Sequence, residues 1–158
     1  MSLPVLNFPP IQARFQNNEA GILQVFDIVR KKFVVLSPEE WVRQHIVHYL
    51  VNEKQVPLSM ISIEKQLLLN GTKKRTDLVI FNSALRPLMI IECKQPSVTL
   101  DQKAINQILR YNLALQAPYL FVSNGNQHVC LKIDGQDPEI LKEFPNYDFL
   151  TKNRQNSK

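Results

Sequence analysis

Two short apolar runs, at residues 75–81 and 88–94, constrain the fold of this chain more than any other part of its sequence. Both runs read as buried strands, yet Asp77 lies near the start of the first, and Glu92 and Lys94 lie at the end of the second. Removing an unpaired carboxylate or ammonium from water is costly, so a buried strand rarely carries such groups without a partner or a function. We therefore expect the fold to place these three charged side chains beside one another or beside other groups that neutralise them.

The length and composition suit one globular domain. A chain of 158 residues, of which 44% are hydrophobic and 21% charged, is long enough to bury a core of its own. We expect a single domain over residues 1–150 that opens with an extended, proline-containing lead-in at 1–20, followed by a polar, disordered tail at 151–158. The net charge of +5 favours polyanionic partners only slightly, because many globular domains are equally basic.

No feature of the sequence indicates export or a membrane. Cys93 and Cys130 lie in apolar, strand-like segments without the close spacing of a metal site, which predicts buried thiols in a reducing compartment. Residues 1–15 lack the apolar run of a signal peptide, and no apolar segment reaches the ~20 residues that a membrane-spanning helix needs. We therefore expect a cytoplasmic protein.

The clearest local signal for a helix is Ser37-Pro38-Glu39-Glu40. A serine can cap the first turn, proline fits the first helical position, and a glutamate three residues after the cap completes a capping box. The spacing of the apolar residues continues this helix to about Glu53.

The elements after this helix alternate between strand and helix. We predict a meander of three strands, an amphipathic helix, and two strands joined by a turn, over residues 61–69, 76–81, 88–93, 101–116, 119–123 and 129–133. The strands before and after the second helix are joined by a crossover, so they should be parallel. This order predicts an α/β fold with a mixed sheet flanked by helices.

The meander predicts that Asp77 and Glu92 meet. In antiparallel neighbours the start of one strand lies beside the end of the next, so the two carboxylates share one edge of the sheet. Two close carboxylates repel each other unless a cation lies between them. Oxygen ligands with room for water and phosphate are typical of Mg²⁺ or Mn²⁺, and the backbone carbonyl of Cys93 is a convenient third metal ligand.

Three further side chains fit the same site. Lys94 follows Glu92 by two positions and so projects from the same face of the strand, where an ammonium can orient an attacking water or hold a phosphate. Gln107 and Tyr111 are four residues apart and share one face of the second helix. Because that helix begins soon after Lys94, it can bring Gln107 beside the carboxylates.

Each of these residues also has a simpler interpretation. An Asp on one strand and a Glu-x-Lys on the next form a loose pattern that more often reflects surface ion pairs. Gln107 could be merely exposed, with Tyr111 half-packed at the rim of the helix. Glu40 either completes the capping box or, because it leans towards the interior, supplies a further acidic group near the metal. Glu64 competes for that second role.

Taken together, the motifs resemble those of the PD-(D/E)XK nuclease superfamily, and most closely those of the N-terminal nuclease domain of type I restriction enzyme R subunits. The matching motifs follow the order of the family, and they are Ser37-Pro38-Glu39-Glu40-Trp41-Val42-Arg43, Lys74-Arg75-Thr76-Asp77, Ile91-Glu92-Cys93-Lys94, Gln107-Ile108-Leu109-Arg110-Tyr111 and Ser123-Asn124-Gly125. The resemblance implies a restriction-endonuclease-like core of helix, β-meander, helix and strand. It also implies Mg²⁺- or Mn²⁺-dependent cleavage of DNA, with endonuclease action favoured.

The resemblance implies roles for the site residues as well. Asp77 and Glu92 correspond to metal ligands, Lys94 to the catalytic lysine, and Gln107 with Tyr111 to a Q-x-x-x-Y element. R subunits that cut DNA carry an ATP-driven motor, whereas this sequence has no G-x-x-x-x-G-K-[ST] motif and is too short for a motor. We therefore expect a nuclease domain that acts on DNA by itself or with separate motor or specificity subunits. A homodimer would suit the cutting of both strands.

Two other classes of function compete with this one. A non-catalytic DNA-binding module would keep the fold and contact phosphates through Lys73-Lys74-Arg75, Arg30-Lys31-Lys32 and Arg110, although a solvated charge run is the commoner explanation of such clusters. A structural subunit of a larger complex is the weaker alternative, which no motif supports. The histidines do not form a metal site with cysteine, and we expect His45 and His48 to face solvent.

Overall fold

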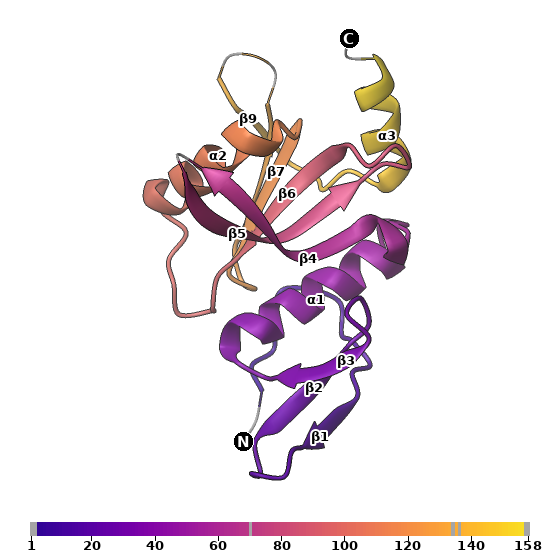
Figure 1. The fold of residues 1–158 in the computed structure, drawn as a ribbon, viewed down its shortest axis with the longest axis vertical. Coiled ribbons are helices and arrows are strands. Elements are labelled where there is room, and N and C mark those ends of the chain that lie inside the picture. Colours follow the sequence, from indigo (N-terminus) through magenta and orange to yellow (C-terminus); the bar gives the residue numbers. More distant parts are fainter. Residues whose placement is uncertain (1–2, 70, 134, 136, 157–158) are drawn as a thin grey trace.

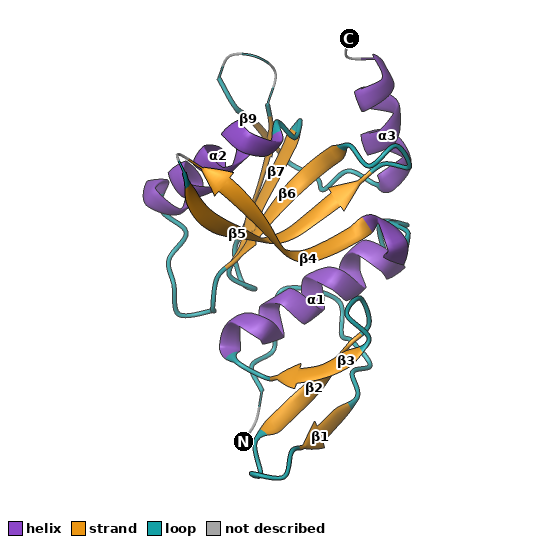
Figure 2. Ribbon diagram, in the orientation of Figure 1, coloured by secondary structure: helices purple, strands orange, loops and turns teal. Residues whose placement is uncertain are grey.

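The computed structural model describes residues 3–69, 71–133, 135 and 137–156. Within these residues the chain forms a three-stranded sheet, a six-stranded sheet and three α-helices (Figure 1). The small sheet lies near the N-terminus, and the first helix lies between it and the large sheet (Figure 2). The large sheet therefore lies on the other side of α1 from the small sheet.

The N-terminal sheet is antiparallel throughout and consists of β1 (Phe15–Asn17), β2 (Leu23–Asp27) and β3 (Lys32–Val35). The lead-in predicted at 1–20 is therefore extended but not unpaired, because its end forms β1, and β3 is a strand that the sequence does not predict. Both strands are short, so pairing with β2 defines them rather than any pattern of their own. Asn18 closes the turn after β1, since its side-chain oxygen accepts the backbone N–H groups of Ala20 and Ile22.

The large sheet is mixed and has the strand order β4-β5-β6-β7-β8-β9. Its strands are β4 (Ile61–Leu69), β5 (Thr72–Phe81), β6 (Pro87–Cys93), β7 (Tyr119–Ser123), β8 (His128–Lys132) and β9 (Glu139–Leu141), and the 3-10 turn η1 (Leu58–Met60) precedes β4. β6 and β7 are parallel, as the crossover predicts, and the other neighbouring pairs are antiparallel. The sequence does not predict β9, which is short, largely exposed and defined by its pairing with β8.

Two helices cover opposite faces of the large sheet, and they are α1 (Pro38–Asn52) and α2 (Gln102–Leu115). Ser37 caps α1 as predicted, with its hydroxyl oxygen 3.0 Å from the backbone nitrogen of Glu40, and Asp101 caps α2 in the same way. α1 packs on the face that carries Cys93, whereas α2 packs on the face that carries Ile90. The predicted α/β fold with a mixed sheet flanked by helices is confirmed.

The C-terminal helix α3 (Tyr147–Asn156) corrects the prediction of a disordered tail at 151–158. Residues 151–156 are helical, and 157–158 lie outside the described residues. The polar residues 151–158 give no signal for this helix, because the side chains that hold α3 against the core come before residue 151. Leu150 is fully buried, and the Tyr147 hydroxyl donates to the backbone carbonyl oxygen of Phe81 at 2.8 Å.

The interior holds both cysteines and one histidine that we expect at the surface. Cys93 and Cys130 are buried free thiols, as predicted. His45 is also buried, whereas His48 is half-buried. The His45 ring nitrogen Nδ1 lies 2.8 Å from the backbone oxygen of Trp41, and burial lowers the pKa of this imidazole. The prediction that His45 faces solvent is therefore wrong, because the N-terminal segment covers that side of α1.

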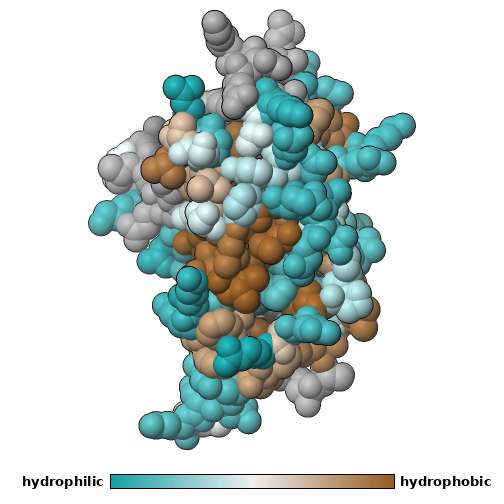
Figure 3. Space-filling view, turned by 90° about the vertical axis from the view of Figure 1, so that its right-hand side faces the viewer, coloured by the Kyte–Doolittle hydropathy of each residue, from teal (hydrophilic) through white to brown (hydrophobic). Residues whose placement is uncertain are grey.

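The outer surface mixes apolar and polar side chains. On the face shown in Figure 3, apolar side chains gather near the middle and polar ones surround them. In the part of the chain that the structure describes, no helix combines the length and the hydropathy that crossing a bilayer requires.

Replacing Leu150 by alanine tests whether α3 belongs to the folded core. We expect Leu150→Ala to lower the free energy of unfolding by about 2–4 kcal/mol, because a fully buried leucine loses its contacts and leaves a cavity. Lys152→Ala is the control, since the side chain of Lys152 is 71% exposed and should contribute less than about 0.5 kcal/mol. Urea unfolding measures both changes, and equal small effects would show that α3 is not docked.

Candidate functional site

The candidate site forms where β5 and β6 begin to separate. Their antiparallel register ends at the pair Leu78–Ile91, and one residue further it places Asp77 opposite Glu92. The Asp77 carboxylate then replaces a strand-to-strand bond, because its Oδ2 accepts the backbone N–H of Cys93 at 2.7 Å. The two acidic residues therefore lie side by side at one edge of the sheet.

A strained residue in the neighbouring strand lies at the same edge. The register between β4 and β5 skips Glu64, which lies opposite Asp77 and has a φ of 54°. This is the left-handed region, which a residue other than glycine enters only at an energetic cost. The ladder between β4 and β5 is therefore interrupted at Glu64 and Asp77, although the pairs on either side keep the same register.

Lys94 connects the carboxylates to α2. Its Nζ lies 3.2 Å from Glu92 Oε1 and donates to Gln107 Oε1 at 3.0 Å. The Gln107 amide in turn donates to the Tyr111 hydroxyl oxygen at 3.1 Å. The structure therefore brings together the five side chains that sequence analysis proposes as catalytic, which are Asp77, Glu92, Lys94, Gln107 and Tyr111.

Glu92 lies in an environment that disfavours its negative charge. Burial, together with the charge of Asp77, raises the pKa of the Glu92 carboxyl group to about 8, although Lys94 opposes that rise. Oε1 contacts Lys94, whereas Oε2 is buried and has no hydrogen-bond partner among the residues that the structure describes. A buried acceptor of this kind costs stability unless a ligand engages it.

These atoms fit a divalent metal ion. Asp77 and Glu92 offer carboxylate oxygens, and the Glu92 Oε2 described above would gain a partner. Cys93 can contribute only its backbone, because its thiol is buried and burial raises its pKa. Within the described ranges, no group of three or more His, Cys, Asp or Glu side chains is arranged for a metal. Two carboxylates alone suit Mg²⁺, which keeps several waters and binds few protein ligands.

Glu40 is neutralised by two arginines. Its Oε1 accepts from Arg43 at 2.7 Å and from Arg30 at 2.9 Å, and its Oε2 accepts from Gln44 at 3.1 Å. These bonds engage the Glu40 carboxylate in an ion-pair network on the side of the N-terminal sheet. Glu64, the competing residue, is more exposed and lies between 3.6 and 3.9 Å from three arginines.

Two charged residues of α1 that we did not predict as site residues, Glu39 and Arg43, also face the site. Arg43 Nη2 donates to Asp77 Oδ1 at 3.1 Å and to Glu39 Oε1 at 3.2 Å. The pKa of the Glu39 carboxyl group is raised. Burial is the larger cause and the charge of Asp77 the next, whereas Arg43 and Lys94 act in the opposite direction. The spacing of four residues between Glu39 and Arg43, which places both on one helix face, is the signal that finds them.

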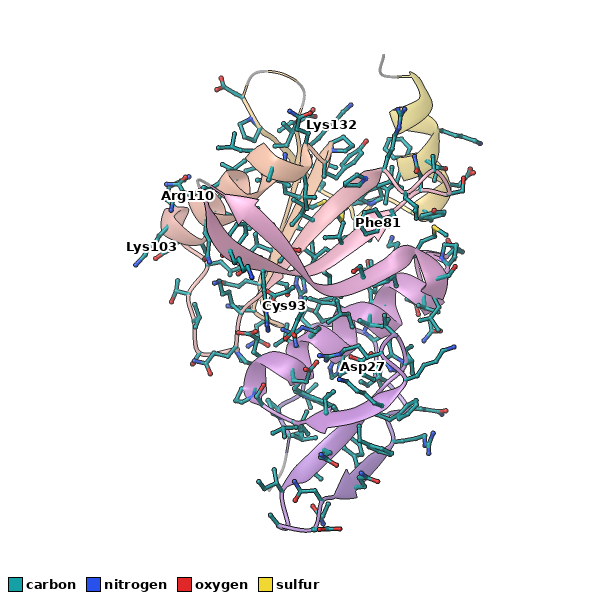
Figure 4. All side chains as sticks on the ribbon, viewed as in Figure 1. Asp27, Phe81, Cys93, Lys103, Arg110 and Lys132 are labelled. Carbon is teal, nitrogen blue, oxygen red and sulfur yellow. The ribbon has the colours of Figure 1, made fainter. Side chains whose placement is uncertain are left out.

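The basic residues considered for DNA contact divide into internal and exposed groups. Arg30 is committed to ion pairs with Asp27 and Glu40. Arg75 is 62% exposed, and Arg110 is exposed on α2, where Figure 4 shows it pointing outward with Lys103. The side chain of Lys74 lies outside the described residues.

Comparison with known proteins gives a family and a similar fold. Residues 38–145 match the model of a family described as type I restriction enzyme R protein N terminus. A solved fragment of an HsdR subunit of a type I restriction enzyme from Vibrio vulnificus YJ016 is similar over 75% of this chain, with a TM-score of 0.57 and 18% identity. At that identity the likeness shows the fold alone, and the match spans 25% of that chain. The search of curated proteins found no match.

Replacing Glu92 by glutamine tests the raised pKa without any metal. The native state keeps the Glu92 proton up to about pH 8, whereas the unfolded chain loses it near 4.5. The native state therefore binds more protons between these values, and stability falls as pH rises through that window. In EDTA, we expect Glu92→Gln to be more stable than the wild type by about 2–4 kcal/mol at pH 8.5 and nearly unchanged at pH 4.5. Urea unfolding measures both, and an equal gain at the two pH values would contradict the assignment.

Proposed function

The chain belongs to the family of type I restriction enzyme R protein N termini, and from that premise we propose that it hydrolyses DNA phosphodiester bonds with Mg²⁺ or Mn²⁺. The observation that carries the proposal is the convergence of Asp77, Glu92 and Lys94 at one buried edge of the sheet. Two adjacent carboxylates beside an ammonium are the groups expected of a PD-(D/E)XK nuclease site.

Asp77, Glu92 and the backbone carbonyl of Cys93 would hold the metal ion. When bound, the ion supplies Lewis-acid stabilisation of the negative charge that develops on the scissile phosphate. The two carboxylates are preorganised for this task, because the N–H of Cys93 fixes Asp77 and Lys94 fixes one oxygen of Glu92. Burial and, after it, repulsion from Asp77 raise the pKa of Glu92, and the bound cation would offset this repulsion.

Lys94 places an ammonium where an attacking water or a phosphate would lie. Contacts with Glu92 and Gln107 use two of its three N–H donors, and its side chain is 21% exposed. The remaining donor can orient the attacking water or bind the scissile phosphate. Gln107, which is itself bonded to Tyr111, sets the direction of the ammonium from the side of α2.

We assign this chemistry to DNA restriction, with endonucleolytic cleavage in the cytoplasm. Residues 1–158 contain no G-x-x-x-x-G-K-[ST] motif for binding nucleotide phosphates, so any ATP-driven movement along DNA would come from a motor outside these residues. Separate specificity subunits would select the DNA sequence. Cleavage of both strands would require two sites, which a second copy of the chain could supply.

Exposed cations near the site favour one alternative, a DNA-binding module that keeps the fold without hydrolysis. Arg75 lies two residues before Asp77 on β5, and Arg110 lies one turn from Gln107 on α2. Contacts of such residues with phosphates would give an affinity that falls as salt rises, whether or not a metal is present.

Titration with Mn²⁺ tests the proposed metal ligands. In calorimetry we expect the wild-type chain to bind Mn²⁺, and Asp77→Asn to bind it at least about tenfold more weakly, because a charged ligand is replaced by a neutral one. Asp148→Asn is the control, since it removes a carboxylate that is 74% exposed on α3. Equal affinities of Asp77→Asn and the wild type would place the metal elsewhere.

Cleavage of supercoiled plasmid DNA tests the hydrolysis itself. We expect nicking with Mg²⁺ that stops in EDTA and falls by about 100-fold or more in Lys94→Ala, because the ammonium acts on the attacking water or the phosphate. Lys132→Ala is the matched control, since Figure 4 shows Lys132 on β8, far from the candidate site. Undiminished nicking by Glu92→Ala would refute the residue assignment, and salt-sensitive binding without nicking would favour the binding module.

A further inference from the structure

Arg43 is a buried arginine at the candidate site to which the proposed hydrolysis assigns no role. It lies on α1, and only 5% of its surface is exposed. Its Nη2 donates to Asp77 Oδ1 at 3.1 Å, and its Nη1 donates to Glu40 Oε1 at 2.7 Å. A guanidinium stays charged in proteins, so a permanent cation already contacts one of the proposed metal ligands.

The two oxygens of Asp77 have different partners. Oδ2 accepts the backbone N–H of Cys93, which ties the carboxylate to β6. Oδ1 accepts the guanidinium of Arg43, which is a contact between opposite charges. A divalent ion at Asp77 would draw on the same negative charge, and two cations that share one carboxylate repel each other. Binding of the metal and pairing with Arg43 therefore oppose one another.

A network on the side of the N-terminal sheet anchors Arg43. Glu40, which pairs with Arg43, also accepts from Arg30 at 2.9 Å. Gln44 donates to Glu40 at 3.1 Å and to Asp27 at 3.2 Å. Asp27 is fully buried at the end of β2, and Figure 4 shows it between α1 and the small sheet. Breaking one pair in such a network would leave a buried charge unpaired, so the guanidinium is held in place while it reaches Asp77.

We propose that Arg43 is a positioning residue that serves as a built-in counter-ion of Asp77 and competes with the divalent metal for that carboxylate. The inference rests on the proposed function, because it takes Asp77 as a metal ligand. In the metal-free chain Arg43 keeps Asp77 paired and oriented, so the site does not collapse by repulsion between its acidic groups. The consequence is a metal affinity lower than the two carboxylates alone would give.

The Mn²⁺ affinity of Arg43 variants tests this competition. Arg43→Gln removes the charge, so we expect it to bind Mn²⁺ at least about tenfold more tightly than the wild type. Arg43→Lys keeps the charge and should stay within about threefold of the wild type. Lys152→Gln is the control for net charge, because it removes an exposed cation on α3 and should also stay within about threefold. If Arg43→Gln binds Mn²⁺ no more tightly than the wild type, the inference is wrong. Weaker binding than the wild type is the result expected if Arg43 only stabilises the fold.

Unfolding in EDTA tests the contact itself in the absence of metal. In a double-mutant cycle with Asp77→Asn, we expect Arg43→Gln to raise the unfolding equilibrium constant about tenfold less in the Asp77→Asn background than in the wild type. If the effects of the two substitutions on the unfolding equilibrium are additive, Arg43 and Asp77 do not form the proposed ion pair. Arg43→Met, which keeps the buried stem of the side chain, replaces Arg43→Gln if the glutamine variant does not fold.

The two measurements separate the inference from the proposed function. If the wild type binds Mn²⁺ and loss of the Arg43 charge does not tighten binding, the inference alone fails. If neither the wild type nor the Arg43 variants bind Mn²⁺, the proposed function fails and the competition fails with it. Binding by Arg43→Gln when the wild type binds none would support both.

Discussion

The close approach of Asp77 and Glu92 is the constraint on which the candidate site depends. Pairing of β5 with β6 forces two acidic groups together at an edge that is largely buried, where like charges repel strongly. The chain balances Asp77 with Arg43 and with the backbone N–H of Cys93, and it balances one oxygen of Glu92 with Lys94. The pKa of Glu92 is nevertheless raised, first because its carboxyl group is buried and second because Asp77 lies beside it.

The balancing groups come from both faces of the sheet, and this explains why the site lies at its edge. Arg43 reaches Asp77 from α1, whereas Gln107 reaches Lys94 from α2. The two helices pack on opposite faces, and side chains from both reach the rim where β5 and β6 separate. A site in the middle of either face would be covered by one helix and out of reach of the other.

The local elements could be predicted from the sequence wherever a residue pattern alone decides the structure. The cap at Ser37, the meander and the crossover follow from patterns of this kind, and the structure confirms them. The strands β1, β3 and β9 could not be predicted, because pairing with a neighbour defines them, and α3 is held by contacts made before its polar end. The contact of Arg43 with Asp77 joins residues far apart in the chain. Which of the two adjacent glutamates of α1 faces the site depends on how the helix is rotated against the sheet, which its own sequence does not specify.

Cys93 lies between two residues of the candidate site in the sequence, yet its thiol points into the core on the opposite face of β6. Alkylating reagents and oxidants attack the thiolate, and burial suppresses its formation by raising the pKa of this thiol. The native fold therefore protects the Cys93 thiol from modification, although Cys93 lies on the strand that carries Glu92. Modification of Cys93 requires that β6 first separate from the helix beneath it, so the rate of labelling at this position reports the local opening of the sheet edge on which the carboxylates are mounted.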